Sequence, residues 1–83
     1  MTYFVYVLLC KGDSYYTGIT NDLNRRYQMH AKGTGAKYTR SYPPIRYVYT
    51  EACSEKSAAL IREHQLKKLS HVQKATLSNP ASL

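Results

Sequence analysis

Apolar and polar positions along the chain predict three strands. The segment Tyr3 to Cys10 is apolar on both faces and rich in β-forming residues, as expected of a central strand covered on both sides. Turn residues follow at Lys11 to Ser14, and the next segment, Tyr15 to Thr20, predicts a second strand. The first twenty residues therefore predict a β-hairpin. After two prolines, Ile45 to Cys53 predicts a third strand.

The segment after the hairpin has the features of a helix. Asn21 is expected to be the N-cap, with Asp22 at a position where the helix dipole favours an anion. The helix is predicted to run to about Ala31. Gly33 and Gly35 are expected to end it and to open a basic loop with the sequence GTGAKYTRSYPP.

Two further helices are predicted near the C-terminus. Ser54 is expected to cap a longer helix that reaches Leu69. Ser70, with Gln73 three residues later, resembles a capping box and predicts a short last helix through about Leu77.

The predicted order of elements is β-β-α-β-α-α. The 83 residues suffice for one compact domain, and we expect it to span residues 1–78, with residues 79–83 as a frayed tail. The fold class is α+β: a small three-stranded antiparallel sheet flanked by helices.

The charge balance suggests a polyanionic partner. The chain has 12 Lys and Arg against 5 Asp and Glu, a net charge of +7 and a pI of about 9.6. The alternative is a surface made soluble by lysines. A stretch that alternates arginine with tyrosine could offer both phosphate donors and stacking faces, although tyrosines are also ordinary strand residues. Its members are Tyr38, Arg40, Tyr42, Arg46, Tyr47 and Tyr49.

Cysteine, histidine and hydropathy patterns argue against several classes of protein. Cys10 and Cys53 are isolated, and the three histidines have no zinc-ligand spacing, so a structural zinc site is not expected. Unpaired cysteines indicate a reducing compartment, and we expect a cytoplasmic location. The N-terminal apolar run is too short for a membrane span or a signal peptide, so no membrane association is expected.

Glu63 stands out among the few acidic residues. Its helical neighbours at i−4, i−3 and i+3 are Ala59, Leu60 and Leu66, which places it on or beside an apolar stripe. A carboxylate there needs a cation, a metal or a proton. An i,i+4 ion pair with Lys67 and a metal-ligand role both remain open.

The first predicted helix carries three polar residues on one face. Asp22, Arg26 and His30 follow one another at i, i+4 and i+8. An arginine beside a histidine can hold a phosphate and move a proton. The alternative is an Asp22–Arg26 surface pair of little energetic consequence.

Tyr6 and Tyr16 lie in the two arms of the hairpin, and the turn decides whether they share a face. A three-residue loop, Gly12 to Ser14, would pair Cys10 with Tyr16 and place both tyrosines on the same face. A two-residue loop would place them on opposite faces. Two tyrosines that serve only in packing are the simpler interpretation.

The segment FVYVLLCKGDSYYTGITNDLNRR resembles the signature of the GIY-YIG nucleases. The first tripeptide of the signature corresponds to Phe4-Val5-Tyr6, and the second corresponds to Tyr16-Thr17-Gly18. The family's helical arginine corresponds to Arg26, the histidine one turn later to His30, and the metal-binding glutamate to Glu63 within LIREHQLKKL. The resemblance covers residues 3–69.

Two positions depart from the signature, since Phe4 replaces the first glycine and Thr17 replaces the middle isoleucine of the second motif. The stretch GAKYTR, from Gly35 to Arg40, is similar to a loop of small bacterial stand-alone members of the family. It is also similar to the nuclease subunit of eukaryotic junction-resolving complexes, which implies a role in DNA repair.

The resemblance implies a metal-dependent endonuclease that hydrolyses DNA phosphodiester bonds. One Mg²⁺ or Mn²⁺ would be held by Glu63, and Arg26 would clamp the phosphate. Tyr6 or Tyr16 would orient the attacking water and accept its proton, with His30 as the second candidate for the base.

Substrate contacts are expected from Gly18, which lets the backbone approach a ligand, and from Lys37, Arg40 and Arg46 on the DNA backbone. No base-reading helix stands out, which favours recognition of shape or of single strands over sequence readout. One alternative is a non-catalytic module that binds nucleic acid or a partner protein. Another is RNA binding or cleavage, because basic tyrosine-rich surfaces serve RNA equally well.

Overall fold

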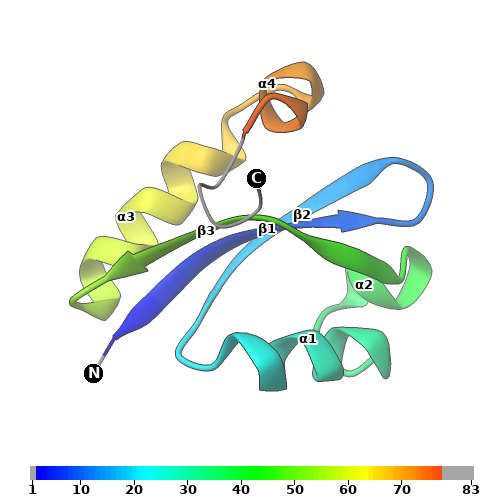
Figure 1. The fold of residues 1–83 in the computed structure, drawn as a ribbon, viewed down its shortest axis with the longest axis horizontal. Coiled ribbons are helices and arrows are strands. Elements are labelled where there is room, and N and C mark those ends of the chain that lie inside the picture. Colours follow the sequence, from blue (N-terminus) through cyan, green and yellow to red (C-terminus); the bar gives the residue numbers. More distant parts are fainter. Residues whose placement is uncertain (1, 78–83) are drawn as a thin grey trace.

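The structure is a computed structural model that describes residues 2–77 (Figure 1). The predicted tail, residues 79–83, lies outside the described residues. Within them the elements are β1 (Tyr3–Cys10), β2 (Ser14–Thr20), α1 (Leu23–Ala31), α2 (Lys37–Ser41), β3 (Pro44–Cys53), α3 (Lys56–Lys67) and α4 (His71–Ala75).

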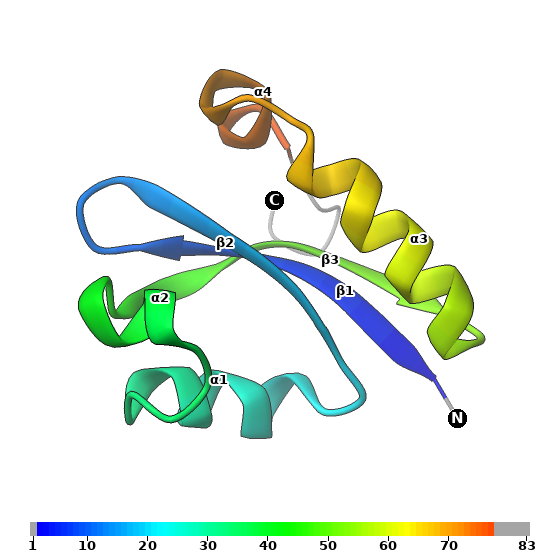
Figure 2. The ribbon, with the colours of Figure 1, turned by 180° about the vertical axis from the view of Figure 1, so that it is seen from behind.

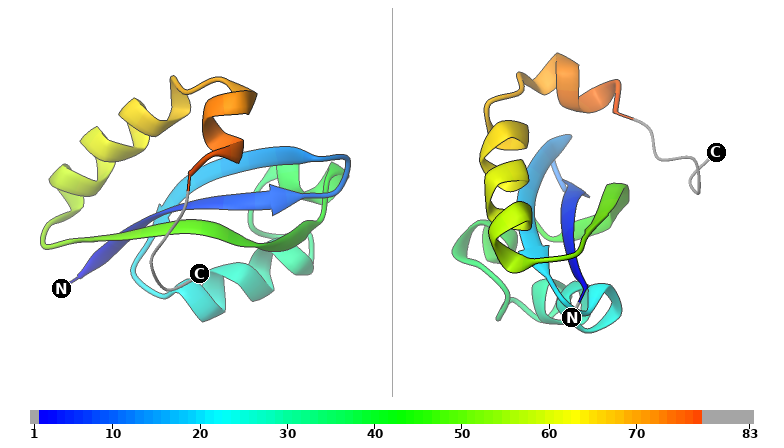
Figure 3. Two further views of the ribbon diagram at one scale, coloured as in Figure 1. Left: turned by 45° about the horizontal axis from the view of Figure 1, so that its top comes forward. Right: turned by 90° about the vertical axis from the view of Figure 1, so that its left-hand side faces the viewer.

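The three strands form one antiparallel sheet in the order β2-β1-β3, which confirms the predicted α+β fold class. Helices α3 and α4 lie on one side of the sheet, and α1 and α2 lie on the other (Figures 1 and 2). The left view in Figure 3 shows the same separation, with α3 and α4 above the strands and α1 below them. None of the helices formed by residues 2–77 has the length and apolar character that a membrane span requires.

Alternation along β1 divides the interior into two small cores. Val5 and Val7 face α3 and pack with Ala59 and Leu66. Tyr6, Leu8 and Cys10 face the opposite way and pack with residues of β2, α1, α2 and β3. All five β1 side chains are fully buried, as expected of a central strand with both faces covered.

The hairpin closes one residue earlier than predicted. Cys10 pairs with Ser14, so the loop consists of Lys11 to Asp13 rather than Gly12 to Ser14. Gly12 and Asp13 take positive φ values of 81° and 56°, a conformation that glycine and aspartate tolerate well and that tightens the turn. The loop still has three residues, so the pairing moves by two positions and every side chain keeps its face.

Two predicted helix caps are displaced by one residue. Asp22, not Asn21, caps α1, because its extended backbone lets its carboxylate accept a hydrogen bond of 3.0 Å from the backbone N–H of Arg25. Glu55, not Ser54, is the N-cap of α3, and its side chain makes no capping bond. Helix α3 ends at Lys67, two residues before the predicted end.

The capping box of the last helix is confirmed. The Ser70 hydroxyl accepts from the backbone of Gln73, and the Gln73 side chain accepts from the backbone of Ser70. The helix ends at Ala75 rather than at Leu77.

Helix α2 was not predicted. The segment around it has glycines before it and prolines after it, and these indicated a loop. The five residues Lys37–Ser41 nevertheless form a helical turn, and Thr39 is buried in it with 1% of its surface exposed.

Candidate active site at the edge of the sheet

A tyrosine and a histidine meet in the interior between β1 and α1. Tyr6 and His30 are both fully buried, and the Tyr6 hydroxyl lies 2.8 Å from Nε2 of the His30 imidazole. Helix α1 is held over this face of the sheet by Leu23 and Tyr27, which pack against the core around Tyr6. A buried polar pair of this kind needs its hydrogen bonds, since water cannot replace them.

Arg26 completes the group, one turn before His30 on α1. Its Nε donates to the Tyr6 hydroxyl at 3.3 Å, and its Nη2 donates to the Gly35 carbonyl at 3.1 Å. The hydrogen bond with Tyr6 raises the pKa of Arg26 above its usual value. The sequence also allowed a surface ion pair between Asp22 and Arg26. In the structure the Asp22 carboxylate instead caps α1, where it accepts a hydrogen bond from the helix backbone.

Two glycines make room for the buried pair. A Cβ atom on Gly18 would lie 2.5 Å from the Tyr6 hydroxyl, and one on Gly35 would lie 2.6 Å from Nδ1 of His30. Gly18 is itself buried beneath the phenol. The structure therefore gives Gly18 a packing role, while its predicted contact with substrate stays a prediction.

Tyr16 shares the face of Tyr6, as the three-residue loop requires. Its ring centroid lies 6.3 Å from that of Tyr6 and 5.2 Å from that of His30. On its other side it stacks on Tyr38 at 5.8 Å, and Tyr38 contacts Tyr42 at 5.1 Å. A row of rings thus runs from the buried pair to Tyr42, which is 46% exposed.

Burial sets the protonation states of the pair. It raises the pKa of Tyr6 to about 12, against the lowering effect of Arg26. Burial also lowers the pKa of His30 to about 4, and the charge of Arg26 acts in the same direction. Near neutral pH, Tyr6 is a phenol and His30 is an uncharged imidazole that can accept a proton.

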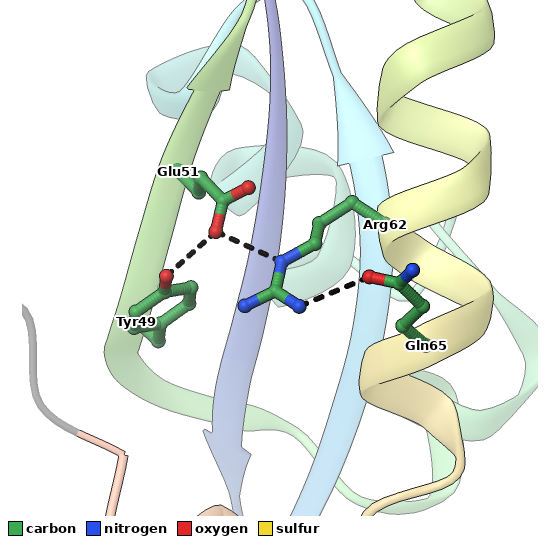
Figure 4. A network of polar contacts seen from close by, with 4 residues as sticks. All are labelled: Tyr49, Glu51, Arg62 and Gln65. Atoms are coloured by element: carbon green, nitrogen blue, oxygen red, sulfur yellow. Dashed lines mark hydrogen bonds and ion pairs between the residues drawn. The ribbon is translucent and has the colours of Figure 1, made fainter.

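Figure 4 shows a polar network that fixes α3 against the other side of the sheet. Arg62 extends from α3 across β1 towards β3, where its Nε donates to Glu51 at 3.0 Å. Tyr49 donates to the same carboxylate oxygen at 2.7 Å, and Arg62 Nη1 donates to Gln65 at 3.1 Å. Burial alone would raise the pKa of Glu51, but the bonds from Tyr49 and Arg62 outweigh it and lower the pKa.

Glu63 lies on the opposite flank of α3 from Arg62. Successive helical residues are separated by about 100°, and the buried stripe of Ala59 and Leu66 runs between the two side chains. Because Arg62 reaches towards β3, the helical spacing places Glu63 on the other flank of this stripe, away from β3. The charge of Glu63 is the smallest of the influences on the raised pKa of Tyr6, which burial dominates.

The Glu63 carboxylate, which is 18% exposed, forms the i,i+4 pair with Lys67 at 3.3 Å. This was one of the two roles left open by the sequence, and metal binding stays a prediction. In residues 2–77 no three His, Cys, Asp or Glu side chains gather as a ligand cluster. The donor set fits a hard divalent cation that keeps most of its waters and takes a single carboxylate, as Mg²⁺ does.

A polar cavity of about 190 Å³ adjoins Arg26. The start of α1 and the end of β2 line it, through Thr20, Asn21, Asp22, Arg25, Arg26 and Met29. Two arginines thus border one hollow, and one of them, Arg26, also bonds to Tyr6. The sequence identified Arg26 but not Arg25, whose position follows from its place in the first turn after the Asp22 cap.

The remaining predicted contact residues are spread over both faces. Lys37 and Arg40 are exposed on α2, close in sequence to the Tyr38 ring that stacks on Tyr16. Arg46 pairs with Leu9, so the register places it on the face opposite Tyr6. In the tyrosine-rich stretch, Tyr47 donates to the Leu23 carbonyl and helps to hold α1.

The chain is similar to several known proteins. A family model described as the GIY-YIG catalytic domain matches residues 2–75. A UPF0213 protein of Natronomonas pharaonis is 47% identical over 75 residues, which cover 90% of this chain and 88% of that protein. A UPF0213 protein of Clostridium perfringens is 45% identical over 80 residues, covering 96% of this chain and 86% of that protein.

A solved structure is similar as well. The solution NMR structure of a UPF0213 protein from Bacillus halodurans has 47% sequence identity and a TM-score of 0.55. The match covers 90% of this chain and 80% of that one.

Proposed function

The chain belongs to the GIY-YIG catalytic domain family, a nuclease family, and we propose that it is a metal-dependent endonuclease that hydrolyses DNA phosphodiester bonds. One observation carries the proposal. A buried phenol and a neutral imidazole touch one another, and an arginine that bonds to the phenol also borders an open polar cavity. Packing alone does not require a polar group of this composition in so small an interior.

Arg26 is the residue that we propose for binding the scissile phosphate. Its guanidinium lines the cavity and keeps its charge at any relevant pH. A planar guanidinium can hold two phosphate oxygens and offset the negative charge that grows during hydrolysis. Arg25 lines the same cavity and adds a second positive charge.

Tyr6 and His30 together form the proposed proton path. A phenol with a pKa of about 12 is a poor base on its own at neutral pH. Tyr6 is fully buried in this structure, so substrate binding would have to admit the attacking water to its hydroxyl. The Tyr6 oxygen could then take a proton from that water while its own proton passes to Nε2 of His30, 2.8 Å away. The positive charge then rests on the imidazole and no free phenolate forms. Tyr16, which contacts both rings, is the second candidate for orienting the water.

Glu63 is the proposed ligand of one Mg²⁺ or Mn²⁺. When bound, such an ion would polarise the phosphate and stabilise the leaving oxygen. Glu63 would have to exchange its contact with Lys67 for the ion, and the Lys67 side chain, which is 54% exposed, can move into solvent when it does so.

DNA is the proposed partner, bound through shape rather than sequence. Lys37 and Arg40 are candidates for contacts to the DNA backbone, and each phosphate they neutralise steepens the salt dependence by roughly 0.9 in log–log slope on duplex DNA. Branched or single-stranded DNA and a role in DNA repair fit a phosphate-binding cavity that is open at the surface and has no base-reading helix beside it. We place this activity in the cytoplasm, where the free Cys10 and Cys53 remain reduced.

The test is nicking of labelled branched, flapped and plain duplex DNA, and of single-stranded RNA, with and without Mg²⁺ or Mn²⁺. We expect metal-dependent cleavage of DNA that falls by ~10²–10³ in Glu63→Gln and Arg26→Ala, because each removes an electrostatic stabiliser of the transition state. Lys67→Ala is the matched control, since it removes the same ion pair but leaves the Glu63 carboxylate in place.

Equal loss of cleavage in Lys67→Ala and Glu63→Gln would show that Glu63 serves only its ion pair. Binding of DNA without any cleavage by the unmodified protein would instead support the alternative of a non-catalytic module. Preferred cleavage of RNA would change the substrate but keep the reaction.

A further inference from the structure

A fourth polar side chain continues the buried network beyond His30. Thr39 of α2 has only 1% of its surface exposed, and its Oγ1 lies 2.7 Å from Nδ1 of His30. The same hydroxyl donates to the Ala36 carbonyl at 3.1 Å. The contacts therefore run from Ala36 through Thr39 and His30 to Tyr6, and Arg26 bonds to Tyr6 from the far side.

Counting protons along this path fixes the direction of each bond. A hydroxyl has one proton, and the Ala36 carbonyl can only accept it, in addition to the backbone N–H of Arg40 at 3.2 Å. With the Thr39 proton on Ala36, the contact between Thr39 and His30 needs the proton on Nδ1. A neutral imidazole carries one N–H, which leaves Nε2 as an acceptor. The Tyr6 hydroxyl then donates to Nε2, and its oxygen accepts from Arg26.

The opposite tautomer breaks this order. If Nε2 carried the proton, Thr39 would have to donate to Nδ1, and the Ala36 carbonyl would lose its bond from the hydroxyl. The Tyr6 oxygen would receive two N–H groups, and its own proton could no longer go to His30. Only the Nδ1–H tautomer satisfies all four contacts at once.

We propose that Thr39 is a positioning residue that holds His30 in the Nδ1–H tautomer, so that Nε2 stays free to accept the proton of Tyr6. The consequence for cleavage rests on the proposed function, whereas the tautomer itself does not. Gly35 supports the arrangement, because its lack of a side chain lets the chain before α2 lie directly against the imidazole.

Thr39→Val is the decisive variant, since valine has the same shape without the hydroxyl. Thr39→Ser restores the hydroxyl in a smaller side chain. Thr34→Val is the matched control, because Thr34 is exposed and its hydroxyl donates to the Met29 carbonyl of α1, away from the His30 ring.

The first measurement is the tautomer of His30, read from the ¹⁵N and ¹³C chemical shifts of its imidazole near neutral pH. We expect Nδ1–H in the unmodified protein, in Thr39→Ser and in Thr34→Val, and a shift of population towards Nε2–H in Thr39→Val. An Nε2–H imidazole in the unmodified protein would overturn the proposal before any variant is made. An unchanged tautomer in a folded Thr39→Val protein would overturn it as well.

The second measurement is cleavage. We expect Thr39→Val to lower kcat by about 10–100-fold with little change in KM, as for other residues that orient a catalytic group, and Thr39→Ser to recover most of the loss. Equal losses in Thr39→Val and Thr39→Ser would indicate a packing role and overturn the proposal. If the unmodified protein cuts no nucleic acid, the proposed function fails, and the chemical shifts still decide the tautomer.

Discussion

The buried His30 predicts that the domain loses stability in mildly acid solution, well above the range in which carboxylates titrate. In the folded state the pKa of His30 is lowered from 6.5 to about 4, because the ring is buried and lies near Arg26. The unfolded chain therefore binds a proton more readily than the folded one. The contribution of His30 to stability is fully present above pH 6.5 and is lost as the pH falls from there towards 4.

The size of the effect follows from the difference in pKa. One pKa unit corresponds to about 1.4 kcal/mol. A pH of 5 lies 1.5 units below the pKa of the unfolded histidine, which is then mostly protonated, whereas the folded histidine is still mostly neutral. The loss between pH 7.5 and pH 5 should therefore be about 2 kcal/mol. That is a large part of the ~5–15 kcal/mol by which a small domain is stable.

The assay is urea unfolding followed by circular dichroism at half-unit steps from pH 7.5 to 5. His30→Gln is the control, because glutamine is uncharged throughout and should remove most of the slope. His30 contacts Tyr6, Tyr16 and Thr39, and the charge of Arg26 acts on it. The pKa values of Tyr6 and Arg26 are both raised, which keeps these two groups out of this range. Glu51, whose pKa is lowered, adds to the loss of stability only as the pH nears 4.5. Its effect is the same in the unmodified protein and in His30→Gln.

Equal slopes in the two proteins would refute the reasoning, because the pH dependence would then come from other groups. A flat profile in the unmodified protein would refute it too, since it would mean that His30 has the same pKa in the folded and unfolded states.

Two further substitutions test the packing on either side of the sheet. Gly18→Ala places a Cβ 2.5 Å from the Tyr6 hydroxyl, so we expect urea unfolding to show about 1–3 kcal/mol of destabilisation, together with a loss of cleavage. Unchanged stability and cleavage would contradict the packing role of Gly18. Thr17→Val should instead stabilise the domain by about 1 kcal/mol with cleavage unchanged, because the buried Oγ1 of Thr17 has no hydrogen-bond partner within residues 2–77. A loss of stability would show that this hydroxyl does make a hydrogen bond.

The strands were predictable because their signal is local. An apolar run without alternation indicates a central strand, and β1 has that place in the sheet. The shared face of Tyr6 and Tyr16 depended on an odd number of loop residues, which the sequence left open. The cap of α1 was misplaced because Asn21 and Asp22 are equally good caps, and only the backbone conformation of Asp22 decides between them.

Much of the buried network was not predictable from local patterns. Helix α2 is five residues long, too short for a periodic signal, and Thr39 is buried only because α1 and the hairpin surround it. His30 was expected on a polar helix face with Asp22 and Arg26, whereas the structure buries it completely. The resemblance to a known family identified the histidine, but it contained no information about what orients its ring.

The position of Glu63 follows from the same network that stabilises α3. Arg62 and Glu63 are neighbours, so a helix that points Arg62 towards β3 turns Glu63 about 100° away from that direction. The bonds of Arg62 to Glu51 and Gln65 therefore set the rotation of α3 and, with it, the direction of the Glu63 carboxylate. The proposed residues thus come from both sides of one sheet: Tyr6, Arg26 and His30 meet on the side of α1, and Glu63 is carried by α3 on the other side.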